Sequence, residues 1–213
     1  MSGTLEGLRM GAVRWQMSEA ISVLRRDPQF RAILKEVGPL ELRARRPYFW
    51  LLASAIIAQQ VSGAAARTIN GRVRALYPDE RFPTPASMLA TSPPALRAAG
   101  VSRQKARYLL ALAEEFESGG LKAVRFSRLT DEEIIERLTS VVGIGRWTAE
   151  MFLIFSMRRR DVFPVDDLGI RKGMEQLFGV SGVPAMIERA ERWRPYRTVA
   201  SLYIWGALSA LPT

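Results

Sequence analysis

Apolar residues recur at helical spacing along almost the whole chain, and this periodicity limits the possible folds more than any other feature. Residues 49–61 are apolar nearly all round, which is typical of a helix buried in the centre of a domain. Elsewhere one face is apolar, as at Ala106, Leu109, Leu110 and Ala113. No stretch alternates at period two over the length of a strand. The sequence predicts an all-α fold of about ten helices in two lobes around a cleft.

Several helix boundaries are also marked. Ser62 precedes an Ala-rich run and caps the helix expected there, so residues 59–62 form a tight corner between two helices. The segment Thr130-Asp-Glu-Glu133 fits a capping box, which places a helix start directly after it. Three further helical patterns lie in the last third of the chain, at residues 167–178, 183–193 and 196–210.

Cysteine and histidine are both absent. Their absence excludes disulfides, thiolate zinc sites and cysteine-bound iron–sulfur clusters. It also excludes histidine general bases, Ser-His-Asp triads and imidazole metal ligands. Any chemistry must therefore come from carboxylates, lysine, tyrosine, hydroxyls or the backbone.

The chain is strongly basic, with 31 Lys and Arg against 21 Asp and Glu and a net charge of +10. Such a charge favours a polyanionic partner, most simply nucleic acid. The alternative is that arginine richness reflects genomic base composition. No apolar run reaches the roughly 18–20 residues of a membrane helix, and the N-terminus lacks a signal-peptide layout. We expect no membrane partner and a cytoplasmic protein, nucleoid-associated in a prokaryote.

Residues 138–151 (Leu-Thr-Ser-Val-Val-Gly-Ile-Gly-Arg-Trp-Thr-Ala-Glu-Met) form the most informative segment. One helix is expected to end near Thr139 and another to start near Arg146, with Gly143 and Gly145 in the turn. Two such glycines allow positive φ and a close backbone approach, and the N–H groups at the next helix start form an anion site. By themselves these residues fit both a phosphate-binding turn and a plain αα-hairpin.

Four segments, in order, resemble a known family. Residues 138–149 resemble the helix-hairpin-helix of the DNA glycosylase superfamily, and residues 161–172 resemble its catalytic-aspartate loop. Residues 55–62 and 191–205 match as well. Together they are similar to the alkylbase family called 3-methyladenine DNA glycosylase II, over about residues 17–208.

The resemblance implies one helix-hairpin-helix glycosylase domain over residues 1–213, with the hairpin at 130–157 and the aspartate loop at 161–168. About sixteen residues precede the first expected helix. The extra N-terminal domain of some relatives is therefore expected to be absent.

The resemblance also implies a reaction. A monofunctional DNA glycosylase flips an alkylated purine, 3-methyladenine and also 7-methylguanine, out of the duplex and hydrolyses its N-glycosidic bond. An abasic site remains for base excision repair. Bond cleavage develops positive charge on the sugar, which a carboxylate stabilises. The family motif assigns this role to Asp167, leaving Asp166 to cap or orient. Without the resemblance, the same pair is typical of a helix cap.

Two residues argue against alternative functions, a bifunctional glycosylase/lyase and a non-catalytic sensor. Bifunctional relatives that act on oxidised bases have a Lys after the Gly-x-Gly-Arg of the hairpin, and this chain has Trp147 there. No lyase activity is expected. A non-catalytic sensor of alkylated DNA is the other alternative. The presence of Asp167 argues against a sensor, because a carboxylate near phosphate repels it.

The matched positions imply a base pocket. Trp147 and Trp205 correspond to the pocket aromatics, with Tyr48 or Phe49 as a further wall, and electron-rich rings stack on cationic alkylated bases. Leu168 stands where a familiar member has an aromatic residue. The alternative for Trp205 and Phe49 is an ordinary place in the core.

The resemblance also implies the DNA contacts. Phosphate is expected at the N–H groups of Gly143 and Gly145, beside Arg146 and Thr148. The corner with Gln59, Gln60 and Ser62 matches the intercalating loop. Gln60 would fill the gap left by the flipped base. Alternatively, Gln59 and Gln60 bond the turn backbone.

No cofactor is expected for this chemistry. Family hairpins bind a monovalent cation (Na⁺ or K⁺) through backbone carbonyls, and the matching carbonyls are those of Thr139 and Val141. The expected partner is double-stranded DNA containing alkylated bases. A single-site enzyme of this kind needs no oligomer, so we expect a monomer.

Overall fold

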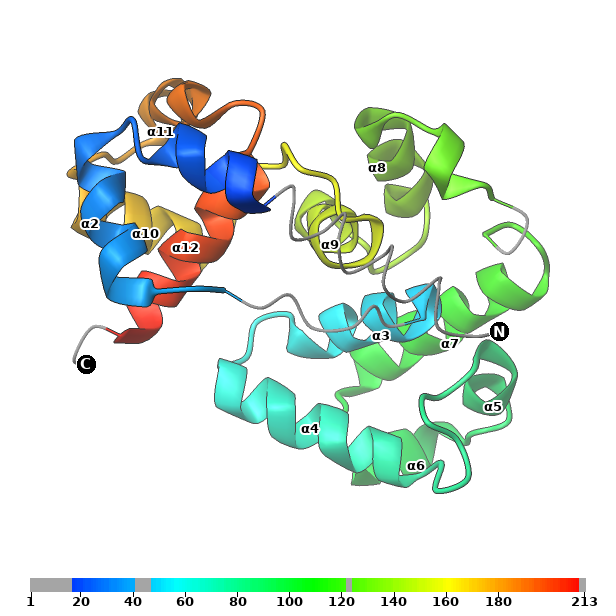
Figure 1. The fold of residues 1–213 in the computed structure, drawn as a ribbon. Helices are drawn as coiled ribbons and strands as arrows, with labels where there is room; N and C mark the ends of the chain where they lie inside the picture. Colours follow the sequence, from blue (N-terminus) through cyan, green and yellow to red (C-terminus); the bar gives the residue numbers. More distant parts are fainter. Residues whose placement is uncertain (1–16, 41–46, 122–123, 211–213) are drawn as a thin grey trace, which may run out of the picture. The chain divides into compact units, whose positions relative to one another are not determined.

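The computed structural model describes residues 17–40, 47–121 and 124–210, and no strand occurs within them. A helix over residues 17–24 is followed by helices α2 to α12 (Figure 1). The all-α prediction is confirmed, with twelve α-helices in these ranges in place of about ten. Residues 1–16, expected to precede the first helix, lie outside the described ranges. None of the helices in those ranges is long and apolar enough to cross a bilayer.

The chain divides into two compact units, in line with the two predicted lobes. The first unit comprises residues 1–43 and 159–213, and the second comprises residues 44–158. The first unit therefore joins the two ends of the chain, whereas the second is one continuous segment.

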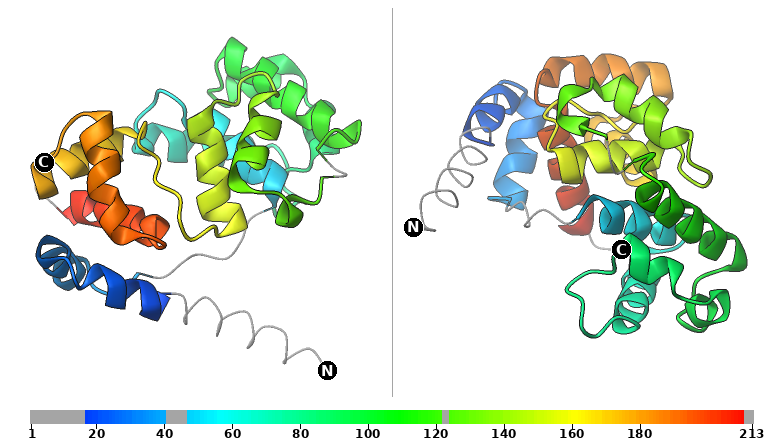
Figure 2. Two further views of the ribbon diagram at one scale, coloured as in Figure 1. Left: turned by 90° about the horizontal axis from the view of Figure 1, so that it is seen from above. Right: turned by 90° about the vertical axis from the view of Figure 1, so that its right-hand side faces the viewer.

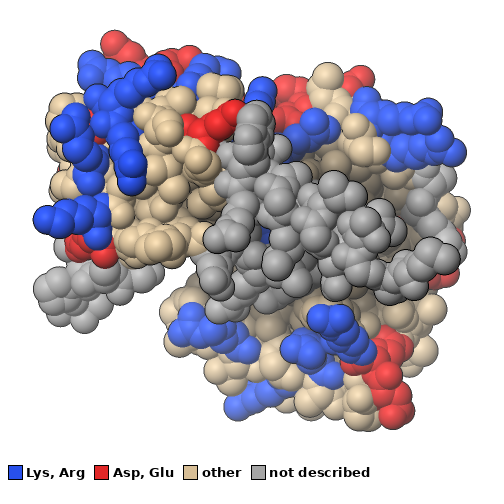
Figure 3. Space-filling model, viewed as in Figure 1, with Lys and Arg blue, Asp and Glu red and all other residues tan. Residues whose placement is uncertain are grey.

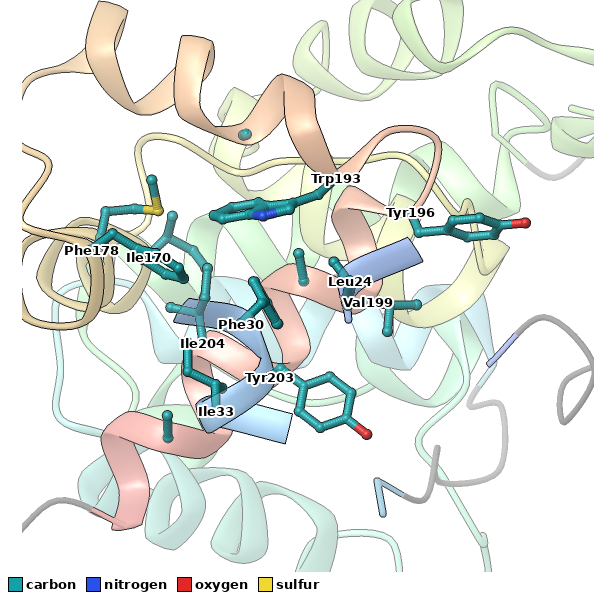
Figure 4. Close-up of a cluster of buried hydrophobic side chains, with 14 of the residues drawn as sticks. Leu24, Phe30, Ile33, Ile170, Phe178, Trp193, Tyr196, Val199, Tyr203 and Ile204 are labelled. Carbon is teal, nitrogen blue, oxygen red and sulfur yellow. The ribbon is translucent and has the colours of Figure 1, made fainter. Parts of the chain in front are cut away.

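Helix α12 organises the first unit by packing against α2 and α10. The core is aromatic: the ring of Phe30 lies 5.0 Å from that of Trp193 and 5.7 Å from that of Phe178 (Figure 4). Tyr203 and Ile204 are also buried in this cluster. After the helix over residues 17–24, the labelled elements of this unit are α2 (Pro28–Val37), α10 (Leu168–Phe178), α11 (Val183–Ala190), the 3-10 turn η3 (Glu191–Trp193) and α12 (Arg197–Ala210).

A buried ion pair lies beside this core. Asp27 caps α2 by accepting from the N–H of Gln29 at 3.1 Å. Its other carboxylate oxygen accepts from the Trp193 indole at 3.1 Å and pairs with Arg189 at 2.5 Å. The side chains of Asp27 and Arg189 are only 8% and 11% exposed. One carboxylate thus links α2, α11 and η3.

We expect Asp27→Asn to lower the free energy of unfolding by about 3 kcal/mol at neutral pH, because Arg189 loses its partner. Burial raises the pKa of Asp27, but hydrogen bonds from Trp193 and Arg189 outweigh it and hold that pKa below its ordinary value. The stabilisation by ionised Asp27 is therefore complete above the unfolded-state pKa and is lost as pH falls through the folded-state pKa. Urea unfolding at a series of acid pH values would measure this. The free energies of unfolding of wild type and Asp27→Asn should become equal as pH falls, and a difference that stays constant with pH would contradict the prediction.

Helix α3 is the centre of the second unit. It packs against α4, α7 and α9, and Trp50, Leu52 and Ile56 on it are fully buried; α3 (cyan) lies beside α9 (yellow-green) in Figure 2. The prediction of a central buried helix is confirmed. The elements of this unit are α3 (Tyr48–Ala58), α4 (Gly63–Ala75), α5 (Pro85–Leu89), α6 (Pro93–Ala98), α7 (Arg103–Glu117), η1 (Phe126–Arg128), α8 (Asp131–Thr139), α9 (Arg146–Phe152) and a π-helical turn η2 (Leu153–Met157).

Candidate active site

The hairpin between α8 and α9 has the predicted boundaries, since α8 ends at Thr139 and α9 begins at Arg146. Gly143 has φ +88°, and a Cβ built on it would lie 2.2 Å from Cγ of Tyr108. The turn therefore lies directly on α7, and only glycine fits there. Gly145 is the N-cap of α9, and a Cβ on it would meet no atom within 4 Å. The inner side of the turn is packed, and its side at Gly145 is open.

Gln59 ties the corner between α3 and α4 to this hairpin. Its Nε2 donates to the carbonyl of Gly143 at 2.9 Å and to Oγ1 of Thr148 at 3.2 Å. Thr148 is only 1% exposed. Its hydroxyl is an internal partner of Gln59, which corrects the expectation that Thr148 meets phosphate. The side chain of Gln59 thus bonds the backbone of the hairpin turn at Gly143, 84 residues away in the sequence.

Gln60 differs from Gln59. It is exposed, with φ 54° in the left-handed region, which costs a non-glycine residue on the order of 1 kcal/mol. Within the ranges described, no hydrogen bond is recorded for its side chain. Val61 beside it is 37% exposed, and Ser62 caps α4 by accepting from the N–H of Ala65 at 3.2 Å. The corner presents Gln60 to solvent on a strained backbone.

The aromatic candidates of the second unit are placed differently. Phe49 is 3% exposed, and its ring packs against Phe116 with centroids 5.6 Å apart. Its surface is used in the core, so we correct the expectation that Phe49 lines a pocket. Tyr48 is 36% exposed, with its ring edge-on to Phe152 at 5.0 Å. Trp147, the second residue of α9, is half-buried.

Arg146 is engaged inside the hairpin. It pairs with Glu132 on α8 at 2.7 Å and with Glu150 one turn along α9 at 3.3 Å. The hydrogen bond that Arg146 donates to Glu132, more than the charge of Glu150, raises the pKa of Arg146. The guanidinium is still half-exposed. It therefore braces α8 against α9 and offers only part of its charge to an outside anion.

The carbonyls proposed for a monovalent cation lie at the end of α8. The Val141 carbonyl accepts from the N–H of Ile144 at 3.1 Å, inside the turn, and Thr139 is the last residue of α8. A carbonyl oxygen has two lone pairs, so this bond leaves one for a ligand. No cluster of three acidic, His or Cys side chains suited to a metal occurs among the described residues.

Asp167 is the N-cap of α10 in the first unit. Its Oδ1 accepts from the N–H of Ile170 at 2.9 Å and from the indole Nε1 of Trp205 at 2.8 Å. A Cβ on Gly169 would lie 2.9 Å from the Trp205 ring and 3.0 Å from Asp167. Glycine at that position thus lets the indole reach the carboxylate. The two donors fix the orientation of the carboxylate.

The neighbours of Asp167 have other roles. Asp166 pairs with Arg171 at 2.8 Å, with both side chains about half exposed. The helix cap is therefore Asp167. Of the two roles expected for Asp166, to cap or to orient, the capping role is corrected. Leu168, the first residue of α10, is 66% exposed.

The loop before Asp167 is tied to α12. Asp161 bonds the Arg197 guanidinium at 2.8 Å and that of Arg194 at 2.9 Å. The N–H of Val162 donates to Oγ1 of Thr198 at 2.9 Å. Because α12 also carries Trp205, one helix fixes both ends of the loop. Sequence reasoning did not single out Asp161, Arg197 or Gly169. A glycine inside a helix, two residues after an Asp pair, is the signal that could have revealed Gly169.

The predicted site residues therefore form two groups. Asp167, Leu168 and Trp205 belong to the first unit, and the hairpin and corner belong to the second. On the face shown in Figure 3, basic side chains outnumber acidic ones over each unit. This surface agrees with the net charge of +10.

Comparison with known proteins decides the family. Residues 53–197 match the model of the HhH-GPD superfamily of base excision DNA repair proteins. The chain belongs to this superfamily. It is 36% identical to DNA-3-methyladenine glycosylase 1 of Schizosaccharomyces pombe over 187 residues, which are 84% of this chain and 82% of the relative.

Solved structures of superfamily members agree. A 3-methyladenine DNA glycosylase of Schizosaccharomyces pombe in complex with abasic DNA superposes with TM-score 0.77 at 34% identity, over 91% of this chain and 98% of the other. A DNA-3-methyladenine glycosidase from Bacillus halodurans gives TM-score 0.74 at 36% identity, over 88% of each chain. The helix-hairpin-helix glycosylase fold expected from the sequence is confirmed.

Proposed function

We propose that this superfamily member is a monofunctional DNA glycosylase that releases alkylated purines, 3-methyladenine and 7-methylguanine, from double-stranded DNA. The carboxylate of Asp167 carries the proposal. It occupies the loop that matches the family's catalytic loop, and Ile170 and Trp205 orient it. The names of the similar proteins support the same substrate class.

The reaction follows from the charge on Asp167. As the N-glycosidic bond breaks, its electron pair leaves with the base, so a cationic methylated purine departs neutral. The sugar acquires positive charge, which a carboxylate already held in place stabilises without reorganisation. Water adds to the sugar carbon and loses its proton. The products are the free base and an abasic site.

Recognition of the base would rest on aromatic stacking. Trp205 contacts Asp167 directly, so a base stacked on its ring would lie close to the carboxylate. In the same unit, the exposed side chain of Leu168 follows Asp167 directly and is a further candidate for contact with the base. In the second unit, the half-buried Trp147 and the partly exposed Tyr48 are the aromatic candidates for stacking. A cationic purine stacks on an electron-rich indole more favourably than a neutral one. This preference selects alkylated bases, whose glycosidic bond is also the weaker one.

The second unit would hold the DNA. The open side of the turn at Gly145 offers backbone N–H groups of α9 to a phosphate, assisted by a monovalent cation on the carbonyls of Thr139 and Val141. Gln60 would enter the gap left by the flipped base, where its amide can hydrogen-bond the orphaned partner base. The half-exposed Arg146 adds positive charge next to the turn.

A lyase step is not expected. Strand cleavage by the bifunctional relatives needs an amine that forms a Schiff base with the sugar, and residues 130–157 contain no lysine. Trp147 occupies the corresponding position. The abasic product should therefore remain uncut.

The test is base release from methylated duplex DNA. We expect 3-methyladenine, identified by chromatography, and strands that are nicked only after alkali treatment. Release of no base from DNA that the protein nonetheless binds would favour the sensor alternative. Nicks before alkali would show a lyase and contradict the monofunctional mechanism.

We expect Trp205→Phe to slow base release by about three- to tenfold while leaving the chain folded. Phenylalanine keeps a ring for stacking but removes the indole N–H that bonds Asp167, a hydrogen bond to a charged group worth about 1.5–3 kcal/mol. Single-turnover kinetics would measure the rate, and thermal unfolding would confirm the fold. A rate equal to that of wild type would mean that the indole does not position Asp167.

A further inference from the structure

The side chain of Lys105 supports the backbone of the corner that carries Gln60. Helix α3 ends with no basic residue in its last turn, although the last carbonyls of a helix lack intrahelical partners. The ammonium of Lys105, which comes from α7, donates to the carbonyl of Ile57 at 2.8 Å and to that of Gln59 at 2.6 Å. One cation thus ties the end of α3 to α7.

The position of Lys105 is partly dehydrated. Burial lowers the pKa of Lys105, so the two carbonyls replace water as partners of the ammonium. A cation at a helix C-terminus also interacts favourably with the helix dipole. Both accepting carbonyls lie just before Gln60, whose left-handed backbone has to be maintained by its surroundings.

Helix α7 supports the hairpin as well as the corner. Tyr108, one turn after Lys105, lies against Gly143, where a Cβ would come within 2.2 Å of its ring. Gln59 completes the link, since its side chain bonds Gly143 and Thr148 while its carbonyl accepts from Lys105. The corner and the hairpin are therefore fixed to one common helix, at adjacent turns.

We propose that Lys105 is a positioning residue, which fixes the corner so that Gln60 can enter the gap beside a flipped base. This inference rests on the proposed function, because it assigns a supporting group to the intercalating residue. Lys105 acts through the backbone of Ile57 and Gln59 and touches neither base nor sugar. Without Lys105, the backbone of the corner shifts when Gln60 enters the base stack. The contacts of Gln60 then no longer offset the free energy needed to extrude a base.

The test measures insertion without requiring base release. The probe is a duplex with a tetrahydrofuran abasic analogue opposite 2-aminopurine, whose fluorescence changes when Gln60 enters the gap facing it. For Lys105→Met we expect the preference for this duplex over undamaged DNA to fall by at least about fivefold, since two charge-assisted hydrogen bonds are lost. The fluorescence change should become smaller in parallel. Lys105→Arg, which can still donate to both carbonyls, should restore both.

Arg107→Met is the matched control, because it removes one positive charge from an exposed position of the same helix. A charge lost from the surface weakens binding to both duplexes equally, so their ratio should stay within about twofold. In a Gln60→Ala background, Lys105→Met should have little further effect on the ratio. Independent losses from the two substitutions would contradict the proposal.

The outcomes distinguish a failure of the proposed role of Lys105 from a failure of the proposed glycosylase function. If wild type shows no preference for the abasic duplex and no fluorescence change, the proposed base flipping fails. If wild type shows both and Lys105→Met retains both, Lys105 is not a positioning residue. If Lys105→Met unfolds below the assay temperature, Lys105→Gln, which keeps one shorter donor, replaces it. Its preference for the abasic duplex over undamaged DNA should then be intermediate, and an unchanged preference would contradict the proposal.

Discussion

Asp167→Asn should release methylated purines at least about 10²-fold more slowly than wild type, because the negative charge facing the developing oxocarbenium ion is lost. The substitution is conservative in structure. An asparagine oxygen can accept from Ile170 and Trp205 as Oδ1 of Asp167 does, and Asn caps a helix about as well as Asp. Single-turnover base release would give the rate, and circular dichroism with thermal unfolding would show a folded protein.

Asp166→Asn is the matched control for this experiment. It removes the same charge one residue earlier, from an exposed pair with Arg171. Such pairs contribute about 0–1 kcal/mol to stability, so both the rate and the stability should stay close to wild type. Equal losses in the two variants would indicate a general effect of charge on the loop. A fully active Asp167→Asn would leave Asp167 as a helix cap alone.

Gly143→Ala should lower the free energy of unfolding by about 2–4 kcal/mol and weaken DNA binding at least tenfold. The new Cβ would sit at φ +88° and within 2.2–2.6 Å of three atoms of Tyr108. The turn would have to lift away from α7, and its carbonyl would lose the bond from Gln59. Urea unfolding and binding to a fluorescent duplex would measure the two effects.

Gly145→Ala separates packing from phosphate contact. Its backbone is extended at φ −95° and ψ 174°, and its Cβ would meet no atom within 4 Å. Stability should change by less than about 0.5 kcal/mol, while DNA binding weakens if a phosphate approaches this residue. If Gly143→Ala were as stable as Gly145→Ala, the contact with Tyr108 would not be what requires glycine. Tyr108→Ala added to Gly143→Ala should recover part of the lost stability.

The helix boundaries could be predicted because their signals are local. Thr130 and Glu133 form the expected capping box, and Ser62 caps α4 as its place before the Ala-rich run suggested. The last three helical patterns became α10, α11 with η3, and α12. A cap or an apolar face depends on residues within one or two turns, so a single sequence carries that information.

The site was predictable only in part. The hairpin glycines and Asp167 stand in short motifs that resemble a known family. The burial and the partners of the side chains around them could not be predicted from such motifs. Thr148 and Phe49 look available for contact in the sequence, yet both are buried. Arg146 looks like a phosphate ligand, yet Glu132 and Glu150 already hold it. Burial and pairing depend on neighbours that are distant in the sequence.

The sequence by itself determined the helices, their ends, the basic charge and the turn, all of which depend on composition or on neighbouring residues. The catalytic candidate, Asp167, came from the resemblance of its motif to a known family. Only the tertiary structure decided which side chains support them. Asp167 and Trp205 are 38 residues apart, Gln59 and Lys105 are 46 apart, and Gln59 and Gly143 are 84 apart. Such pairs form when helices pack, and no local pattern specifies which two faces will meet.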